Sequence, residues 1–228
     1  METTLSFDDD LSLEGLSIGL VEAAGLDWAA MSRDVAAPAG GHVASVVGEA
    51  KEKGEALIRQ SRKSAVRAML RHGSYKPAGR GKPSSEYLLQ AALEDDFPSV
   101  NYFVDSANIV SLLSGYPISL IDLGKSGPDL LLRRGRALES YIFNQGGQTI
   151  DLTDLLCVCR KTGEGYIPTA NPVRDSMATK IFPGAACIVA VIYSPWGSEG
   201  MDLGSACSAL SAYLGKAAAR SEWIIREA

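Results

Sequence analysis

The stretch Val100-Asn101-Tyr102-Phe103-Val104-Asp105-Ser106-Ala107-Asn108-Ile109-Val110-Ser111, followed by Pro117-Ile118-Ser119-Leu120-Ile121-Asp122, mixes short polar side chains into an apolar pattern. If a helix begins at Asp105, whose carboxylate can accept from free backbone N–H groups, then Asp105, Asn108 and Ser111 share one face. The opposite face would carry a core stripe made of Ile109, Leu112, Leu113 and Tyr116. The pattern therefore predicts a helix with one dry face and one face that lines a pocket.

The rest of the chain predicts strands enclosed by helices. Short aliphatic runs between turn residues predict strands at 16–21, 118–121, 130–133, 155–159 and 185–193. Helical spacing predicts a short helix at 28–33, a long basic helix at 49–71, a helix after Ser84 or Ser85, and a C-terminal helix at 202–220 with Asp202 as its cap.

The order of these elements favours an α+β fold. Helices come first, then strands, then a helix, which predicts a layered single domain with a central mixed or antiparallel β-sheet flanked by helices. The Pro/Gly-rich segment 36–41 is expected to be a loop. Residues 1–50 would then form a strand, a helix and a loop packed on the core, and residues 51–228 the main domain, with a basic lead-in helix and a C-terminal helix.

Composition is that of an ordinary globular protein. Of the 228 residues, 46% are hydrophobic and 21% charged, with a net charge of −5. The N-terminus lacks the basic start and apolar block of a secretory signal. The longest apolar run, at 185–193, is far shorter than the roughly 20 residues of a membrane helix. We therefore expect a cytoplasmic protein without a membrane span.

Cysteine and histidine usage argues against a metal site. The four cysteines show no CxxC spacing, and the chain has two histidines. Cys157 and Cys159 alternate on a predicted strand and should be small buried core residues. Because most hydrolytic triads use histidine, we expect any chemistry here to depend on carboxylates, hydroxyls and bound water, with no cofactor.

Basic residues are concentrated in the segment 51–82, which holds ten of the 22 in the chain. Four of them, Arg59, Lys63, Arg67 and Arg71, recur at every fourth position and would form one stripe along a helix. Together with Lys76 and Arg80, this stripe could contact a phosphate backbone. The alternative is a charged helix face that is merely solvated.

Several motifs in order resemble a known family. The series Asp105, Asn108, Ser111-Leu112, Pro117 and Asp122 resembles the B3/B4 domain of the phenylalanyl-tRNA synthetase β subunit. The segment 173–179 resembles the Arg-Asp/Glu-Ser-x-x-Thr turn of free-standing B3/B4 proteins. Segments 75–77, 83–86 and 97–101 look like the lead-in of that group. The resemblance covers roughly residues 60 to 195.

This resemblance implies a pocket that recognises the aminoacylated end of tRNA. Its residues would be Asp105, Asn108, Ser111, Ser119, Arg174, Asp175, Ser176 and Thr179. In the synthetases, this domain hydrolyses the ester that joins the wrong amino acid, tyrosine, to tRNA. Bacterial synthetases use a histidine where this chain has Ser119, and a glutamate on a late strand, whereas 185–193 contains no carboxylate.

Hydrolysis by this chain would therefore use other groups. Asn108 and Ser119 would donate to the developing oxyanion, and Asp122 or Asp175 would orient water. Each polar residue also has a structural interpretation: Asp105 could be a helix cap, backbone could satisfy Asn108, and 174–175 could form a surface turn. Residues for ATP-driven amino-acid activation are not recognisable, so ligase activity is not expected.

Three functions stay open at the level of sequence. The first is a free-standing B3/B4-type protein that binds tRNA, aminoacyl-tRNA or a related RNA, with deacylation of misacylated tRNA as an additional activity. The second is a small-molecule binding protein whose pocket holds an amino-acid-like ligand without RNA or catalysis. The third is a protein-interaction module with a vestigial pocket, whose function a substitution of Asn108 by Ala would leave intact.

Overall fold

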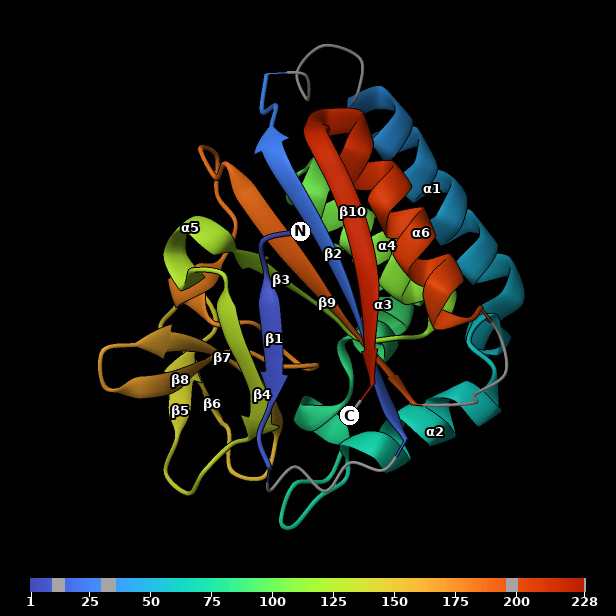
Figure 1. The fold of residues 1–228 in the computed structure, drawn as a ribbon. Helices are drawn as coiled ribbons and strands as arrows, with labels where there is room; N and C mark the ends of the chain where they lie inside the picture. The colour runs from blue at the N-terminus through green and yellow to red at the C-terminus, as the bar shows by residue number, and fades with distance from the viewer. Residues whose placement is uncertain (10–14, 30–35, 196–200, 228) are drawn as a thin grey trace.

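The computed structural model describes residues 1–9, 15–29, 36–195 and 201–227, and its strands form two sheets and a hairpin (Figure 1). The first sheet has the order β10 (Ala218–Glu227), β2 (Leu16–Leu26), β9 (Cys187–Pro195) and β3 (Ile118–Asp122), with all neighbours antiparallel. Because β2 and β9 are central and aliphatic, both are almost wholly buried.

The second sheet has the order β1 (Thr4–Phe7), β4 (Asp129–Arg134), β7 (Leu156–Thr162) and β8 (Gly165–Ala170). Here β1 is parallel to β4, and the other pairs are antiparallel. A separate hairpin pairs β5 (Ser140–Ile142) with β6 (Thr149–Asp151). The apolar side chains of both larger sheets join in one core.

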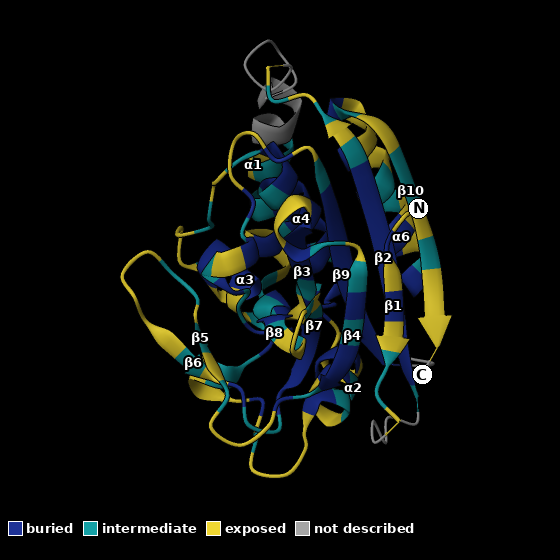
Figure 2. Ribbon diagram, turned by 60° about the vertical axis from the view of Figure 1, so that its left-hand side comes forward, coloured by how far each residue is buried: buried dark blue, intermediate teal, exposed yellow. Residues whose placement is uncertain are grey.

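Helices form a layer on one face of the first sheet. This layer contains α1 (Ala36–Lys53), α3 (Ser84–Leu93), α4 (Tyr102–Ser114) and α6 (Leu203–Leu214), while α2 (Gln60–Leu70) lies near the C-terminal end of β10 (Figure 1). Close packing depends on Gly19 of β2, where an added Cβ would lie 2.4 Å from the Cys207 sulfur of α6. The buried strands β2 and β9 lie between the helices and the second sheet (Figure 2).

Short helical turns connect these elements. They are η2 (Gly54–Leu57), η3 (Gly79–Gly81), α5 (Leu123–Ser126), η4 (Met177–Thr179) and η5 (Gly215–Ala217). The fold is a mixed α+β single domain, which confirms the predicted class. Its strands are divided between two sheets rather than gathered in one, because the turns after β3 and β8 send the chain to a new layer.

Several predicted boundaries are wrong, for identifiable reasons. The segment 36–41 is the start of α1 rather than a loop, and Pro38 is tolerated in the first turn because its missing N–H has no intrahelical partner there. The predicted basic helix 49–71 is interrupted at Gly54, whose φ of +56° cannot continue a helix. Apart from Trp28 and Ala29, the predicted helix at 28–33 lies outside the described residues.

The C-terminal helix also ends earlier than predicted. It stops at Leu214, and the chain turns through η5 into strand β10, which the sequence pattern did not indicate. In the parts of the chain that the structure describes, no helix has the length and apolar character needed to cross a membrane.

Candidate binding cleft

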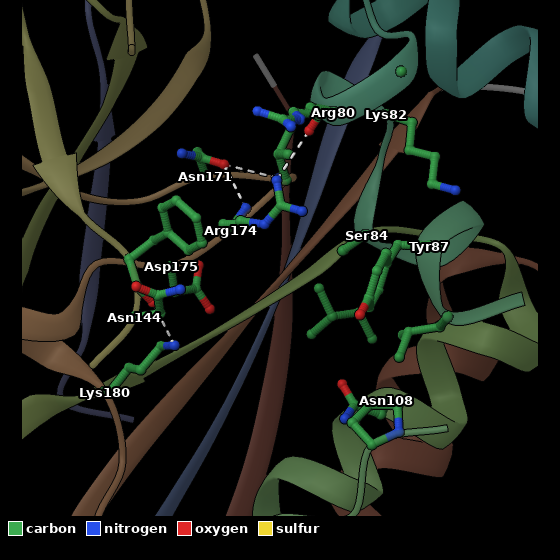
Figure 3. Close-up of a pocket in the computed structure, with 16 residues that line it drawn as sticks. Arg80, Lys82, Ser84, Tyr87, Asn108, Asn144, Asn171, Arg174, Asp175 and Lys180 are labelled. Atoms are coloured by element: carbon green, nitrogen blue, oxygen red, sulfur yellow. Dashed lines mark hydrogen bonds between the residues drawn. The ribbon is translucent and has the colours of Figure 1, made fainter. Parts of the chain in front are cut away.

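A cleft opens between α3, α4, β3 and the segment 171–180 (Figure 3). It consists of two adjoining cavities with volumes of about 430 Å³ and about 540 Å³. They share the lining residues Asn108, Ile118, Asn144, Asp175 and Lys180, so the two cavities are continuous. Both volumes fall within the range of about 300–1,000 Å³ that is typical of ligand sites.

The smaller cavity is lined by cations and aromatic rings. Arg80, Lys82 and Arg174 all line it, and among the described residues none of the three forms an ion pair. Arg174 Nη1 donates to the Arg80 carbonyl oxygen at 3.0 Å, and its guanidinium lies 5.0 Å from the centre of the Phe143 ring. Tyr87 is 46% exposed and lies across the cleft from Arg174, with the Lys82 ammonium 5.8 Å from the centre of its ring (Figure 3). This end of the cleft is therefore positively charged on a chain of net charge −5.

The larger cavity is mostly apolar. Its walls come from the start and middle of α4, from β3 and from the segment after η4, through the side chains of Val100, Val104, Ala107, Leu120, Ile181 and Phe182. Val100 is 63% exposed at the rim, whereas Leu120 is buried at the floor. An apolar group could lose its hydration by entering this end of the cleft.

Polar groups stand where the two cavities meet, with Asn108 on the α4 wall and Asp175 and Lys180 on the wall across from it (Figure 3). The Asn108 carboxamide makes no hydrogen bond with any described residue, although it is only part-exposed. Asp175 Oδ2 accepts from the Leu120 backbone N–H at 2.9 Å, while its buried Oδ1 accepts no hydrogen bond from the described residues. Unused hydrogen-bonding capacity at the junction suits a polar ligand group.

Burial controls the ionisation of Asp175. Desolvation by burial raises the pKa of its carboxyl to about 6, although the hydrogen bond from the Leu120 N–H and the charge of Lys180 act to lower this pKa. Burial lowers the pKa of Lys180, whose Nζ donates to the Phe143 carbonyl oxygen at 2.6 Å. A carboxyl with a pKa near neutrality can both accept and release a proton under ordinary conditions.

The start of α4 differs from the prediction. The helix begins at Tyr102 and is capped by Asn101, whose side-chain oxygen accepts from the Val104 N–H at 3.1 Å. Asp105 is buried in the first turn, and its carboxylate accepts from the Val100 N–H at 2.8 Å and the Ser99 hydroxyl at 3.3 Å. Burial raises the pKa of Asp105. This carboxylate holds the lead-in segment on the helix and does not line the cleft.

Two of the predicted hydroxyls, those of Ser111 and Ser119, do not line the cleft. Ser111 is buried and donates to the Tyr116 carbonyl oxygen at 2.7 Å, which supports the end of α4. Ser119 is also buried: its Oγ donates to the Asn171 carbonyl oxygen and lies 3.0 Å from the Tyr193 hydroxyl oxygen. Both hydroxyls therefore have partners within the fold.

The remaining predicted residues form local caps. Ser176 caps η4, accepting from the Ala178 N–H at 3.2 Å, and Thr179 Oγ1 lies 2.8 Å from Thr169 Oγ1. Asp122 caps α5, accepting from the Gly124 N–H at 3.0 Å, and forms an ion pair with Lys125. Of the residues predicted to form the pocket or act in catalysis, Asn108, Arg174 and Asp175 line the cleft.

The predicted basic stripe is broken up by the fold. Lys63 is buried and paired with Glu55, and Arg67 is paired with Glu86 of α3. Arg59, Arg71 and Lys76 are exposed outside the cleft, whereas Arg80 lines it. Sequence reasoning included Lys82 in the basic segment 51–82 without naming it as a site residue, and it missed the cleft residues Tyr87, Phe143, Asn144 and Lys180. Lys82 precedes Pro83 and the start of α3, so the sequence alone places a cation at the beginning of a predicted helix.

No metal centre is formed by the side chains that the structure describes, since no three of their His, Cys, Asp and Glu groups gather closely enough. The predicted core cysteines Cys157 and Cys159 are both buried and free, and burial raises the pKa of each thiol. A raised thiol pKa disfavours the nucleophilic thiolate.

Comparison with solved structures gives a distant likeness in fold. No protein-family model matches the chain, and no curated protein matches it. The chain is similar to the crystal structure of an N-terminal fragment of the phenylalanyl-tRNA synthetase β subunit from Pyrococcus horikoshii, with a TM-score of 0.47 and 10% sequence identity. The match covers 99% of this chain and 51% of that chain, so the present chain spans about half the length of that fragment. Membership of the B3/B4 family stays a prediction.

Proposed function

We propose that the cleft binds the aminoacylated end of an RNA, with tRNA as the first candidate. The observation that carries this proposal is the direct junction of a cationic, aromatic cavity with an apolar one at Asn108 and Asp175. The groups of an aminoacyl-nucleotide follow the same order as the parts of the cleft. A phosphate, base and ribose come first, then a polar ester and amine, and then the amino-acid side chain.

The cationic cavity would hold the nucleotide. Arg80, Lys82 and Arg174 offer charge to phosphate oxygens without first having to give up an ion pair within the described chain. The exposed ring of Tyr87 offers a surface for a base, a contact worth about 1–3 kcal/mol where such stacking is measured. These side chains replace the helical stripe that the sequence predicted as the RNA contact.

The junction would hold the ester. The Asn108 amide would donate to the ester carbonyl oxygen, and the Asp175 carboxylate would accept from the ligand's amine or from a bound water. In the hydrolytic form of the proposal, Asp175 takes a proton from that water as its oxygen bonds to the carbonyl carbon. The ester C–O bond then breaks, and the 3′ oxygen of the RNA leaves with the proton that Asp175 returns to it. The apolar cavity would take the amino-acid side chain.

Ester loss from a panel of misacylated tRNAs tests the hydrolytic form. We expect release above the spontaneous rate for large apolar amino acids, and its loss in Asp175→Asn and Asn108→Ala. Ser111→Ala is the matched control, because this hydroxyl lies on α4 but is buried away from the cleft. No release from any tRNA would remove the enzymatic form and leave binding to be tested.

RNA binding is tested separately by charge reversal. Arg174→Glu and Lys82→Glu should weaken binding and reduce its salt dependence, since each removes about one phosphate contact. Arg59→Glu serves as the control, because this arginine lies outside the cleft. Equal weakening by all three variants would contradict the assignment of the phosphate site to the cleft.

A second candidate is an amino-acid-like small molecule bound without RNA. The volume of the apolar cavity, about 540 Å³, favours it, because a small ligand could be enclosed there alone. Binding of a zwitterion should respond weakly to added salt and should not change in Lys82→Glu, whereas binding of RNA should respond steeply.

A further inference from the structure

Strand β10 is a long open edge of the first sheet. It has ten residues and pairs with β2 along one side only, and among the described residues no strand pairs with its other side. The strand lies at the rim of the molecule, largely exposed (Figure 2). The other outer strands are shorter: β1 has four residues, β3 five, and β8 six, including Pro168. An unpaired edge of this length exposes N–H and C=O groups that can pair with another chain.

Apolar side chains stand on this edge. Trp223 is 41% exposed and Ile225 is 37% exposed. Both lie on the face that α6 covers, because Ser221 Oγ is 2.9 Å from Ser211 Oγ of α6 and side chains two residues apart share a face. Exposed tryptophan and isoleucine on an unpaired strand are typical of an interface rather than of a solvated edge.

We propose that a second copy of this chain pairs with β10, so that the first sheet continues across a two-fold axis. An axis perpendicular to the sheet keeps both α6 helices on the same face. It also requires that one residue of β10 lies opposite the same residue of the partner copy. A register shifted by one residue would place side chains of opposite faces across from each other, which an antiparallel pair does not allow.

Charge and apolar contact together select the register, because centring the pair on Ser221 would also place Arg220 opposite Glu222 but would put Trp223 opposite Ala219. With Ile224 opposite its own copy, two symmetric pairs form between Glu222 and the partner's Arg226, and two between Trp223 and the partner's Ile225. Within its own chain Glu222 also pairs with the Met1 ammonium and with Arg220. Centring the pair on Trp223 would instead place Arg220 opposite Arg226. Centring it on Ile225 would place Trp223 opposite Glu227. The register centred on Ile224 is therefore self-complementary in both charge and apolar contact.

Helix α6 fits the same arrangement. It packs on both β10 and β2. An axis midway between these two strands would lie about 2.4 Å inside β10 in the plane of the sheet. With about 4.8 Å between the two β10 strands, the α6 axes would lie roughly 10 Å apart, at the upper end of helix packing distances. The side of α6 nearest the edge carries the small residues Gly204, Ser208 and Ser211, which permit that approach.

The test is the mass of the chain in solution, with a register-specific cross-link. Light scattering of the purified chain at high micromolar concentration should give twice the 24.1 kDa mass. Ile224→Cys should form a disulfide between copies under mild oxidation, because directly opposed antiparallel residues have Cα atoms about 4.5–5.5 Å apart. Ala219→Cys is the control, since in this register it lies about 30 Å from its own copy.

Arg226→Glu should raise the dimer dissociation constant roughly tenfold, because it turns two attractive cross-strand pairs into repulsive ones. A monomer at every concentration would overturn the proposal. A dimer that resists Arg226→Glu and does not cross-link through residue 224 would also overturn it, because such a dimer would use another surface. Since β10 lies apart from the cleft residues, either result leaves the proposed function untouched.

Discussion

Replacing Asp175 with Asn should remove a pH-dependent loss of stability. Burial raises the pKa of this carboxyl from 3.8 to about 6, a difference of about two pKa units, at 1.36 kcal/mol per unit. Because the folded-state pKa is raised, the associated stability is fully present below about pH 4 and is lost as the pH rises through about 6. The loss amounts to at most about 3 kcal/mol in the free energy of unfolding.

Asparagine stays neutral, so the variant should not lose stability in this pH range. Urea unfolding of both proteins at several values from about pH 4 to about pH 8 measures the difference directly. We expect the free energy of unfolding of Asp175→Asn to increase relative to that of the wild type as the pH rises, with most of the change between about pH 4 and about pH 6.5.

Asp154→Asn is a control of opposite sign, because hydrogen bonds from Ser74 lower the pKa of Asp154, so this carboxylate loses its contribution as the pH falls. A difference between Asp175→Asn and the wild type that stays constant with pH would refute the buried, proton-retaining state of Asp175.

Three further substitutions test the packing and the cleft. Gly135→Ala should destabilise the fold by about 3 kcal/mol or more in thermal unfolding, because the new Cβ would lie 1.8 Å from the Leu152 carbonyl oxygen; a fully stable variant would contradict this contact. Ser111→Ala should lower the free energy of unfolding by about 1–2 kcal/mol, because the buried Tyr116 carbonyl loses its hydroxyl donor. Ligand affinity should not change; weakened binding would show that this hydroxyl contributes to the binding site. Val104→Phe should fill the apolar cavity and weaken binding of aminoacyl-RNA more than of uncharged RNA, as compared by titration; equal effects on the two would argue against that role for the cavity.

Local patterns in the sequence were enough to predict much of the fold. The strands near 118–121, 130–133 and 185–193 and the amphipathic helix predicted from Asp105 follow from aliphatic runs and spacing, and the structure confirms these elements. Helix α4 starts three residues earlier than predicted, because Asn101 and Asp105 are both good caps and the local pattern does not rank them. Strand β10 was missed because the alanines at 217–219 continue the helical spacing, and its pairing partner β2 lies about two hundred residues away in the chain.

The site was less predictable than the fold. Asn108, Arg174 and Asp175 were found through a motif, and they line the cleft. Ser111 and Ser119 share that motif, but Ser111 donates to the carbonyl of Tyr116 in the turn that ends α4, and Ser119 donates to the carbonyl of Asn171, 52 residues away. Lys82, Phe143 and Lys180 come from separate segments that meet across the cleft, so no local spacing indicated them.

The most direct measurement compares the affinity of the chain for one RNA with and without an esterified large apolar amino acid, using a non-hydrolysable linkage. If the apolar cavity receives the side chain and the junction receives the ester, the acylated RNA binds more tightly and Val104→Phe removes the difference. Equal affinities for the two RNAs would contradict the proposed division of the cleft into a nucleotide end and an amino-acid end.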